Sequence, residues 1–86
     1  MEPYELLIKH SVARDLRGIP REDVERILER ISELPRDPRP LGVEKLSAQE
    51  RYRLRQGDYR IIYGIDDRAQ LVEVVQVGHR RDVYRR

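Results

Sequence analysis

Three prolines within six residues, Pro35, Pro38 and Pro40, divide this chain into two parts of different character. Proline has no backbone N–H donor and fixes its own φ, so a helix or strand cannot continue through this segment. Apolar residues recur at helical spacing before it and at strand spacing after it. Neither part of an 86-residue chain is long enough to build a core of its own. The sequence therefore predicts one domain, residues 1–86, with the proline segment as an internal loop.

The chain begins with a predicted strand and a short helix. Residues 4–9 are assigned to the strand because apolar side chains occupy alternate positions. The helix covers 11–17, with Ser11 as its N-cap and with Ala13 and Leu16 on its inner side.

The second helix is the most regular pattern in the chain. Pro20 lies near its first turn, where a missing N–H donor costs little, and Glu22 and Asp23 favour that end electrostatically. An apolar stripe recurs at helical spacing along one side of the helix: Val24, Ile27, Leu28, Ile31 and Leu34. The opposite side of the helix alternates Glu and Arg, as is typical of a solvated face.

Three strands follow the proline segment. Residues 51–56 alternate between apolar and basic side chains, and Gly57 provides a tight turn into a strand over 59–65. The apolar run 71–77 predicts the central, best-covered strand, which Gly78 ends.

The order β-α-α-β-β-β predicts a small α+β domain. Two N-terminal helices pack on one face of a mainly antiparallel four-stranded sheet, and residues 80–86 add a short C-terminal helical turn.

Composition excludes several classes of protein. The absence of cysteine excludes a disulfide framework and thiolate metal sites. The two histidines lack metal-ligand spacing, and no glycine-rich phosphate loop is present, so we expect no metal and no cofactor. No apolar run approaches the ~18 residues of a membrane span, and the N-terminus lacks a signal-peptide pattern. We therefore expect a cytoplasmic protein that does not contact a membrane.

Positive charge is concentrated at the C-terminal end of the chain. The net charge is −2 over residues 1–50 and +4 over residues 51–86. Such an asymmetry favours an anionic partner.

Three arginines account for much of this charge. Arg53 and Arg55 share one side of their strand, and Arg60 begins the next strand across a very short turn, at a strand edge that adds little to the core. Like charges at this distance destabilise a sheet unless an anion relieves them, so they indicate a phosphate site. The alternative is a solvated sheet face on which Glu73 or Asp58 neutralises part of the charge.

The tail adds two side chains that can transfer protons. His79 titrates near neutral pH and is a candidate acid or base; the alternative is a surface histidine just after a strand. Tyr84 can move a proton or stack on a base, or it can anchor the tail by apolar contact.

Segments 52–63 and 77–85 resemble the RelE family of bacterial and archaeal toxins, and the element order agrees over almost the whole chain. This resemblance implies a small ribonuclease that enters the ribosomal A site and cuts mRNA there. The 2′-hydroxyl of the RNA is the nucleophile, the products are a 2′,3′-cyclic phosphate and a 5′-hydroxyl, and no metal takes part.

The resemblance also implies roles for single residues. Arg53 and Arg55 match basic strand residues of the family's active site, and Arg60 matches the arginine that holds the scissile phosphate. Arg80 matches the arginine after the last strand, and Tyr84 matches a tail tyrosine.

This chain departs from the family at the two strand positions, which are often lysines, one of them a candidate general base. Arginine stays protonated in proteins and is poorly suited to that role. Either His79 or Tyr84 is then the base, or catalysis is slower and mostly electrostatic. Four further arginines are candidate RNA contacts: Arg51, Arg81, Arg85 and Arg86.

The family further implies a cognate antitoxin that wraps around the toxin, and operator DNA that is bound only through the toxin–antitoxin complex. The ribosome and mRNA are the other expected partners. Two alternatives remain: a ParE-like toxin that poisons DNA gyrase, and a catalytically inactive binding module that acts with its antitoxin in repression.

Overall fold

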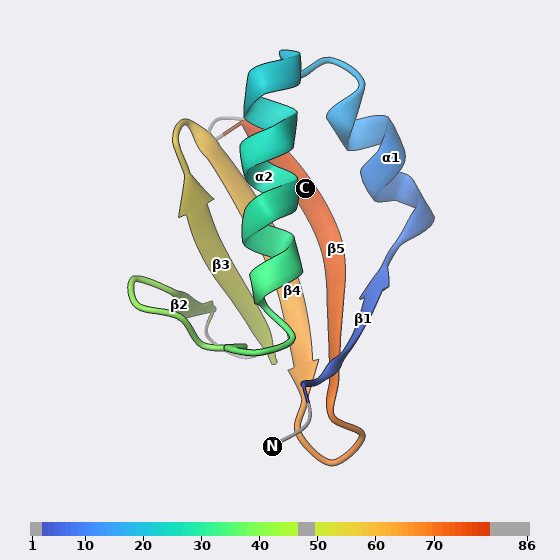
Figure 1. Ribbon diagram of the computed structural model, residues 1–86, viewed down its shortest axis with the longest axis vertical. Helices are drawn as coiled ribbons and strands as arrows, with labels where there is room; N and C mark the ends of the chain where they lie inside the picture. Colours follow the sequence, from blue (N-terminus) through green and yellow to red (C-terminus); the bar gives the residue numbers. More distant parts are fainter. Residues whose placement is uncertain (1–2, 47–49, 80–86) are drawn as a thin grey trace.

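The computed structural model describes residues 3–46 and 50–79 of the chain. These described residues form two helices and five strands (Figure 1). In chain order they are β1 (Glu5–Ile8), α1 (His10–Leu16), α2 (Arg21–Glu33), β2 (Glu44–Leu46), β3 (Arg51–Gln56), β4 (Tyr59–Asp66) and β5 (Leu71–His79).

The sheet has five strands rather than the predicted four. Its order is β1-β5-β4-β3-β2, with β1 parallel to β5 and the other neighbours antiparallel. The additional strand is β2, which follows the proline segment and pairs with β3 at the edge of the sheet. Three residues are too few to show the alternation by which a strand is recognised.

The middle strand is β4, and the prediction that the apolar run 71–77 is central was wrong. β4 lies between β3 and β5, and every residue from 60 to 65 is buried. β5 lies one place further out and is longer than predicted. Gly78 does not end it, because pairing with β4 continues as far as His79.

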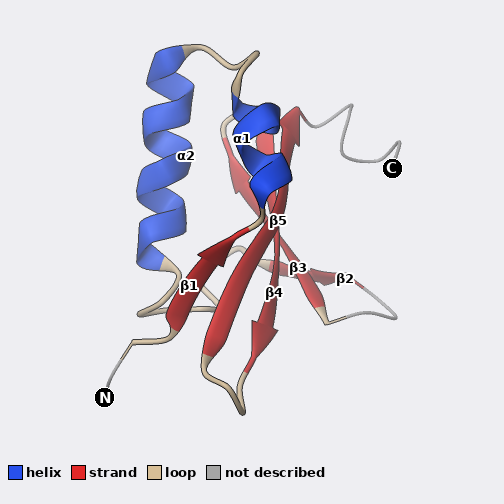
Figure 2. Cartoon of the chain, turned by 90° about the vertical axis from the view of Figure 1, so that its right-hand side faces the viewer, coloured by secondary structure: helices blue, strands red, loops and turns tan. Residues whose placement is uncertain are grey.

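Both helices cover the same face of the sheet (Figure 2). Ile27 and Ile31 of α2, and Leu34 at its C-cap, are buried there in one cluster with apolar residues of β3, β4 and β5. Leu28, which belongs to the predicted apolar stripe, remains 43% exposed. The apolar stripe of α2 is therefore narrower than its sequence pattern suggests.

The first helix starts earlier than predicted. It begins at His10, and its N-cap is Lys9, which forms no side-chain capping hydrogen bond, so Ser11 lies inside the helix. Val12 is buried, whereas Ala13 is exposed. The larger apolar side chain thus takes the core position, because its burial removes more apolar surface from water.

The proline segment is held against the sheet by polar contacts. The Tyr63 hydroxyl donates a hydrogen bond of 2.7 Å to the carbonyl oxygen of Pro38. The guanidinium of Arg39 donates to both carboxylate oxygens of Asp67, at 3.2 and 2.9 Å, and the Tyr4 hydroxyl donates to the same carboxylate at 2.7 Å. This carboxylate, in the turn between β4 and β5, joins the proline segment to the residue just before β1.

Replacing Asp67 with asparagine is expected to lower the melting temperature at neutral pH. The hydrogen bond from Arg39 holds the pKa of Asp67 below its ordinary value of 3.8, so folding favours the ionised carboxylate. This stabilisation is present above about pH 4 and is lost as the pH falls through the lowered pKa of the folded state. The difference in melting temperature between Asp67→Asn and the wild type should therefore become smaller at acidic pH.

Thermal melts at several pH values check this expectation. Asp58→Asn is the matched control, because Asp58 lies exposed in the turn between β3 and β4. A wild-type melting temperature for Asp67→Asn at pH 7 would contradict the proposed role of the carboxylate.

Within residues 3–46 and 50–79, no helix has both the length and the apolar character that a membrane crossing requires. The predicted C-terminal helical turn at 80–86 lies outside the described residues.

Because both helices pack on one side, the sheet has two different faces: one that the helices cover and one that they do not cover.

Candidate functional site

The sheet face opposite the helices carries an arginine cluster, formed by Arg53, Arg55 and Arg60. Tyr52 and Leu54 are buried on the helix side, so the alternate residues of β3 project to the other side. Arg55 and Arg60 are direct cross-strand partners in the β3–β4 pair. Their predicted closeness is therefore confirmed.

Arg60 is more enclosed than the sequence indicated. It was expected at a strand edge with little part in the core, but it lies in the central strand and is only 7% exposed. Its Nη1 donates a hydrogen bond of 3.3 Å to the carbonyl oxygen of Tyr59. Its Nε is buried and has no hydrogen-bond partner among the described residues. Because water screens the charge of so enclosed a cation poorly, its field acts strongly on an anion bound beside it.

The cluster is partly neutralised by Glu44, on the unpredicted strand β2. Glu44 pairs in register with Arg53, whose Nη2 donates a hydrogen bond of 3.1 Å to Glu44 Oε2. The Nε of Arg55 lies 3.7 Å from Glu44 Oε1, an ion pair without hydrogen-bond geometry. The Arg53 side chain is only 14% exposed, whereas that of Arg55 is 62% exposed.

The electrostatics of Glu44 follow from these contacts. The hydrogen bond and charge of Arg53, with smaller contributions from Arg55 and Arg60, hold the pKa of Glu44 below its ordinary value. Glu44 is therefore ionised at neutral pH. Neither Glu73 nor Asp58 forms an ion pair with these arginines in the described part of the chain, so the predicted counter-ions were the wrong ones.

Arg51 lies beside the cluster and packs over β4. It is the register partner of Gly64, and a Cβ atom added at Gly64 would collide with the Arg51 guanidinium. Glycine at this position lets the guanidinium approach the backbone of β4 closely. Arg51 therefore extends the positive surface along β3.

His79 lies on the other face, away from the arginine cluster. It pairs in register with Tyr59, and the two rings meet edge to face with their centroids 5.8 Å apart. Tyr59 packs against the core beneath the helices. The structure therefore does not bring His79 together with Arg53, Arg55 and Arg60.

A β-bulge explains this orientation. Tyr63 pairs with Val74 while Ile62 pairs with Gln76, so β5 contains one residue more than β4 at this point. Without the bulge, strict alternation from Val74 would direct His79 to the arginine face. The additional residue shifts the alternation, so every later residue of β5 points to the opposite face of the sheet from the one it would otherwise take.

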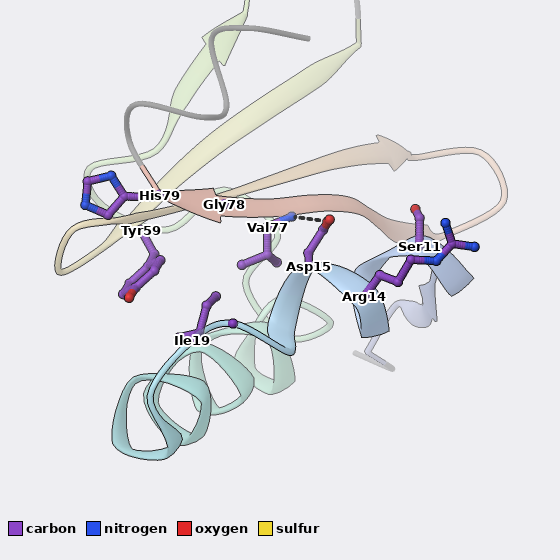
Figure 3. A pocket seen from close by; sticks show the side chains of 9 residues that line it. Ser11, Arg14, Asp15, Ile19, Tyr59, Val77, Gly78 and His79 are labelled. Atoms are coloured by element: carbon purple, nitrogen blue, oxygen red, sulfur yellow. Dashed lines mark hydrogen bonds between the residues drawn. The ribbon is translucent and has the colours of Figure 1, made fainter.

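His79 and Tyr59 instead border a pocket of about 630 Å³ between α1 and the end of β5 (Figure 3). Arg14 and Asp15 line it from the helix. Asp15 accepts a hydrogen bond of 3.0 Å from the backbone N–H of Val77, which lies beyond the part of β5 that β1 covers. Asp15 thus satisfies a strand donor that the short partner strand cannot reach.

Several predicted site residues lie outside the described residues, and the structure says nothing of their placement: Arg80, Arg81, Tyr84, Arg85 and Arg86. Residues 3–46 and 50–79 contain no group of three or more side chains that could hold a metal ion. The described site is therefore a positively charged surface made of arginines and one carboxylate.

Comparison with known proteins identifies the family to which this fold belongs. The ParE toxin family of the type II toxin–antitoxin system parDE matches residues 6–84. Toxin RelE of Mycobacterium tuberculosis is 33% identical over 85 residues, which cover 96% of this chain and 88% of that protein. The chain belongs to the RelE/ParE family of type II toxins.

Two further relatives resemble this toxin over nearly their full length. Toxin RelG of M. tuberculosis is 31% identical over 86 residues, covering 98% of this chain and 99% of the relative. RelE in the archaeal RelE–RelB complex from Pyrococcus horikoshii superimposes with a TM-score of 0.82 at 28% identity, covering 93% of this toxin and 98% of that chain. The predicted family and the α+β fold are thereby confirmed.

Proposed function

We propose that this RelE/ParE-family toxin is an endoribonuclease that cuts mRNA in the ribosomal A site and so inhibits translation. The observation that supports this most strongly is the arginine cluster, in which Arg55 and Arg60 face each other on the uncovered sheet face. Like charges in direct cross-strand contact are unfavourable without an anion, and a phosphodiester is an anion that matches the guanidinium fork.

In the proposed reaction the 2′-oxygen of the RNA attacks the adjacent phosphorus while the bond from phosphorus to the 5′-oxygen breaks. The 2′-hydroxyl proton passes to a base, and the departing 5′-oxygen takes up a proton. Arg60, buried and with an unused Nε, stabilises the charge that builds on the phosphoryl oxygens. Arg53 and Arg55 orient the phosphate, while Tyr84 and Arg80 remain proposed contributors from the tail.

The orientation of His79 argues against its use as the proton carrier. His79→Ala is expected to leave the cleavage rate within about twofold of wild type and the pH–rate profile unchanged in shape, because the imidazole lies on the helix side. Single-turnover cleavage measured across pH checks this. A loss of more than about tenfold, with an altered pH profile, would return His79 to the mechanism.

The proposed partners follow from the relatives. The P. horikoshii relative was solved as a RelE–RelB complex, and we propose that a cognate antitoxin likewise neutralises this toxin. Binding to operator DNA would then occur only through the complex. The substrate requires a site of action in the cytoplasm, on ribosomes carrying mRNA.

Cleavage on programmed ribosomes tests the proposal. The antitoxin-free toxin is mixed with ribosomes that carry a defined mRNA, and the RNA ends are mapped; free mRNA serves as the control. Cuts in the A-site codon that need the ribosome would support the nuclease. Absence of cleavage by folded toxin would contradict it and would favour an inactive binding module.

A ParE-like toxin that poisons gyrase is the second candidate, because the family that matches residues 6–84 is named after the ParE toxin. Purified gyrase with supercoiled DNA separates the two candidates. Trapped gyrase–DNA cleavage complexes, without cuts in ribosome-bound mRNA, would favour the ParE-like activity.

A further inference from the structure

The carboxylate of Glu44 occupies donors that an RNA phosphate would use. Its Oε2 accepts the hydrogen bond from Arg53 Nη2 at 3.1 Å, and its Oε1 lies 3.7 Å from Arg55 Nε. A carboxylate and a phosphodiester both offer anionic oxygens to a guanidinium fork, so they compete for the same N–H groups.

The balance of charge makes this competition significant. Among the described residues, three arginines meet one carboxylate, so this part of the cluster has an excess of positive charge but less than its arginines alone would supply. Glu44 is 44% exposed and projects from a three-residue edge strand. Its side chain can therefore move aside without disturbing the core.

We propose that Glu44 is an internal competitor of the RNA phosphate, which lowers the affinity of the toxin for free RNA. This inference depends on the proposed function, because it assumes that the arginine cluster is the RNA site. A phosphate reaches the Arg53 Nη2 donor only by displacing the carboxylate. A phosphate held by the more exposed Arg55 is repelled by the charge of Glu44. A substrate held by additional contacts, such as mRNA on the ribosome, overcomes this competition, whereas a short free strand does not.

Binding of a 2′-O-methyl RNA oligonucleotide tests the proposal, because such an RNA lacks the 2′-hydroxyl and cannot be cleaved. Fluorescence anisotropy should show that Glu44→Gln binds it about three- to tenfold more tightly than wild type. This is the change produced by removing one charge about 7 Å from a phosphate in a mostly aqueous environment. The gain should shrink between about 0.05 and 0.5 M salt, because it is electrostatic.

Glu50→Gln is the matched control. Glu50 precedes β3 and pairs with Lys45 at 3.6 Å, so its removal changes the net charge equally without touching the cluster. Glu44→Asp is the second variant, since it keeps the charge and should retain an affinity close to that of wild type. Melting temperatures confirm that each variant is folded.

The outcomes distinguish a failure of the competitor proposal from a failure of the proposed RNA site. Tighter binding by Glu44→Gln, but not by Glu50→Gln or Glu44→Asp, supports the competitor. Equal or weaker binding by Glu44→Gln, together with a loss of binding in Arg60→Ala, overturns the competitor and leaves the RNA site in place. RNA binding that does not change in Arg60→Ala removes the cluster as the RNA site and overturns both proposals.

Discussion

Replacing Arg60 with alanine is expected to lower the rate of mRNA cleavage on ribosomes by at least about 100-fold, the loss typical of removing one preorganised donor to a developing anion. The structure places Arg60 in the central strand, where the residue is only 7% exposed and water screens its charge poorly. The fold should survive, because the substitution also removes the repulsion with Arg55 across the β3–β4 pair.

Two variants make this result interpretable. Arg68→Ala removes the same charge from the exposed turn between β4 and β5 and should cleave at the wild-type rate. Arg60→Lys keeps the charge but loses the planar fork, so intermediate activity is expected. A folded Arg60→Ala variant with wild-type cleavage would remove Arg60 from the site, and loss of folding in both Arg60 variants would assign it a structural role.

Replacing Ile27 with alanine is expected to reduce the free energy of unfolding by about 2–5 kcal/mol. Ile27 is completely buried between α2 and the sheet, so the shorter side chain leaves a cavity. Native domains are stable by only about 5–15 kcal/mol, so this one change removes a large share of the total. Urea denaturation followed by circular dichroism measures it.

The next residue along α2 is the control. Leu28 is 43% exposed, so Leu28→Ala should lower the free energy of unfolding by less than about 1 kcal/mol. Both substitutions remove the same number of carbon atoms from the side chain. Equal losses in the two variants would mean that the helix packs on the sheet through a different face from the one observed.

The sequence predicted the arginine pair because its determinants are local. A two-residue turn at Gly57, where φ is +59°, fixes the register of β3 and β4 and sets Arg55 opposite Arg60. Helical periodicity likewise located Ile27 and Ile31 in the core. Both predictions depend on residues that are neighbours along the chain.

Two features of the site could not be predicted in this way. Glu44 reaches Arg53 only because a three-residue strand returns to the sheet after the proline segment. His79 faces the helices only because of the bulge opposite Ile62 and Tyr63, which no local pattern indicated. Non-local pairing and a one-residue irregularity thus decided which polar groups share a face.

The parallel pairing of β1 with β5 has a consequence for synthesis of the toxin. β1 is the first strand made, but its partner residues, Leu71 to Val74, are among the last of the described chain. Contacts between such distant segments form late, because a long loop must close before they can stabilise the fold. Until β5 has left the ribosomal exit tunnel, the nascent chain has an unpaired first strand and an incomplete sheet. The fold itself thus delays the appearance of a complete sheet until β5 has been synthesised.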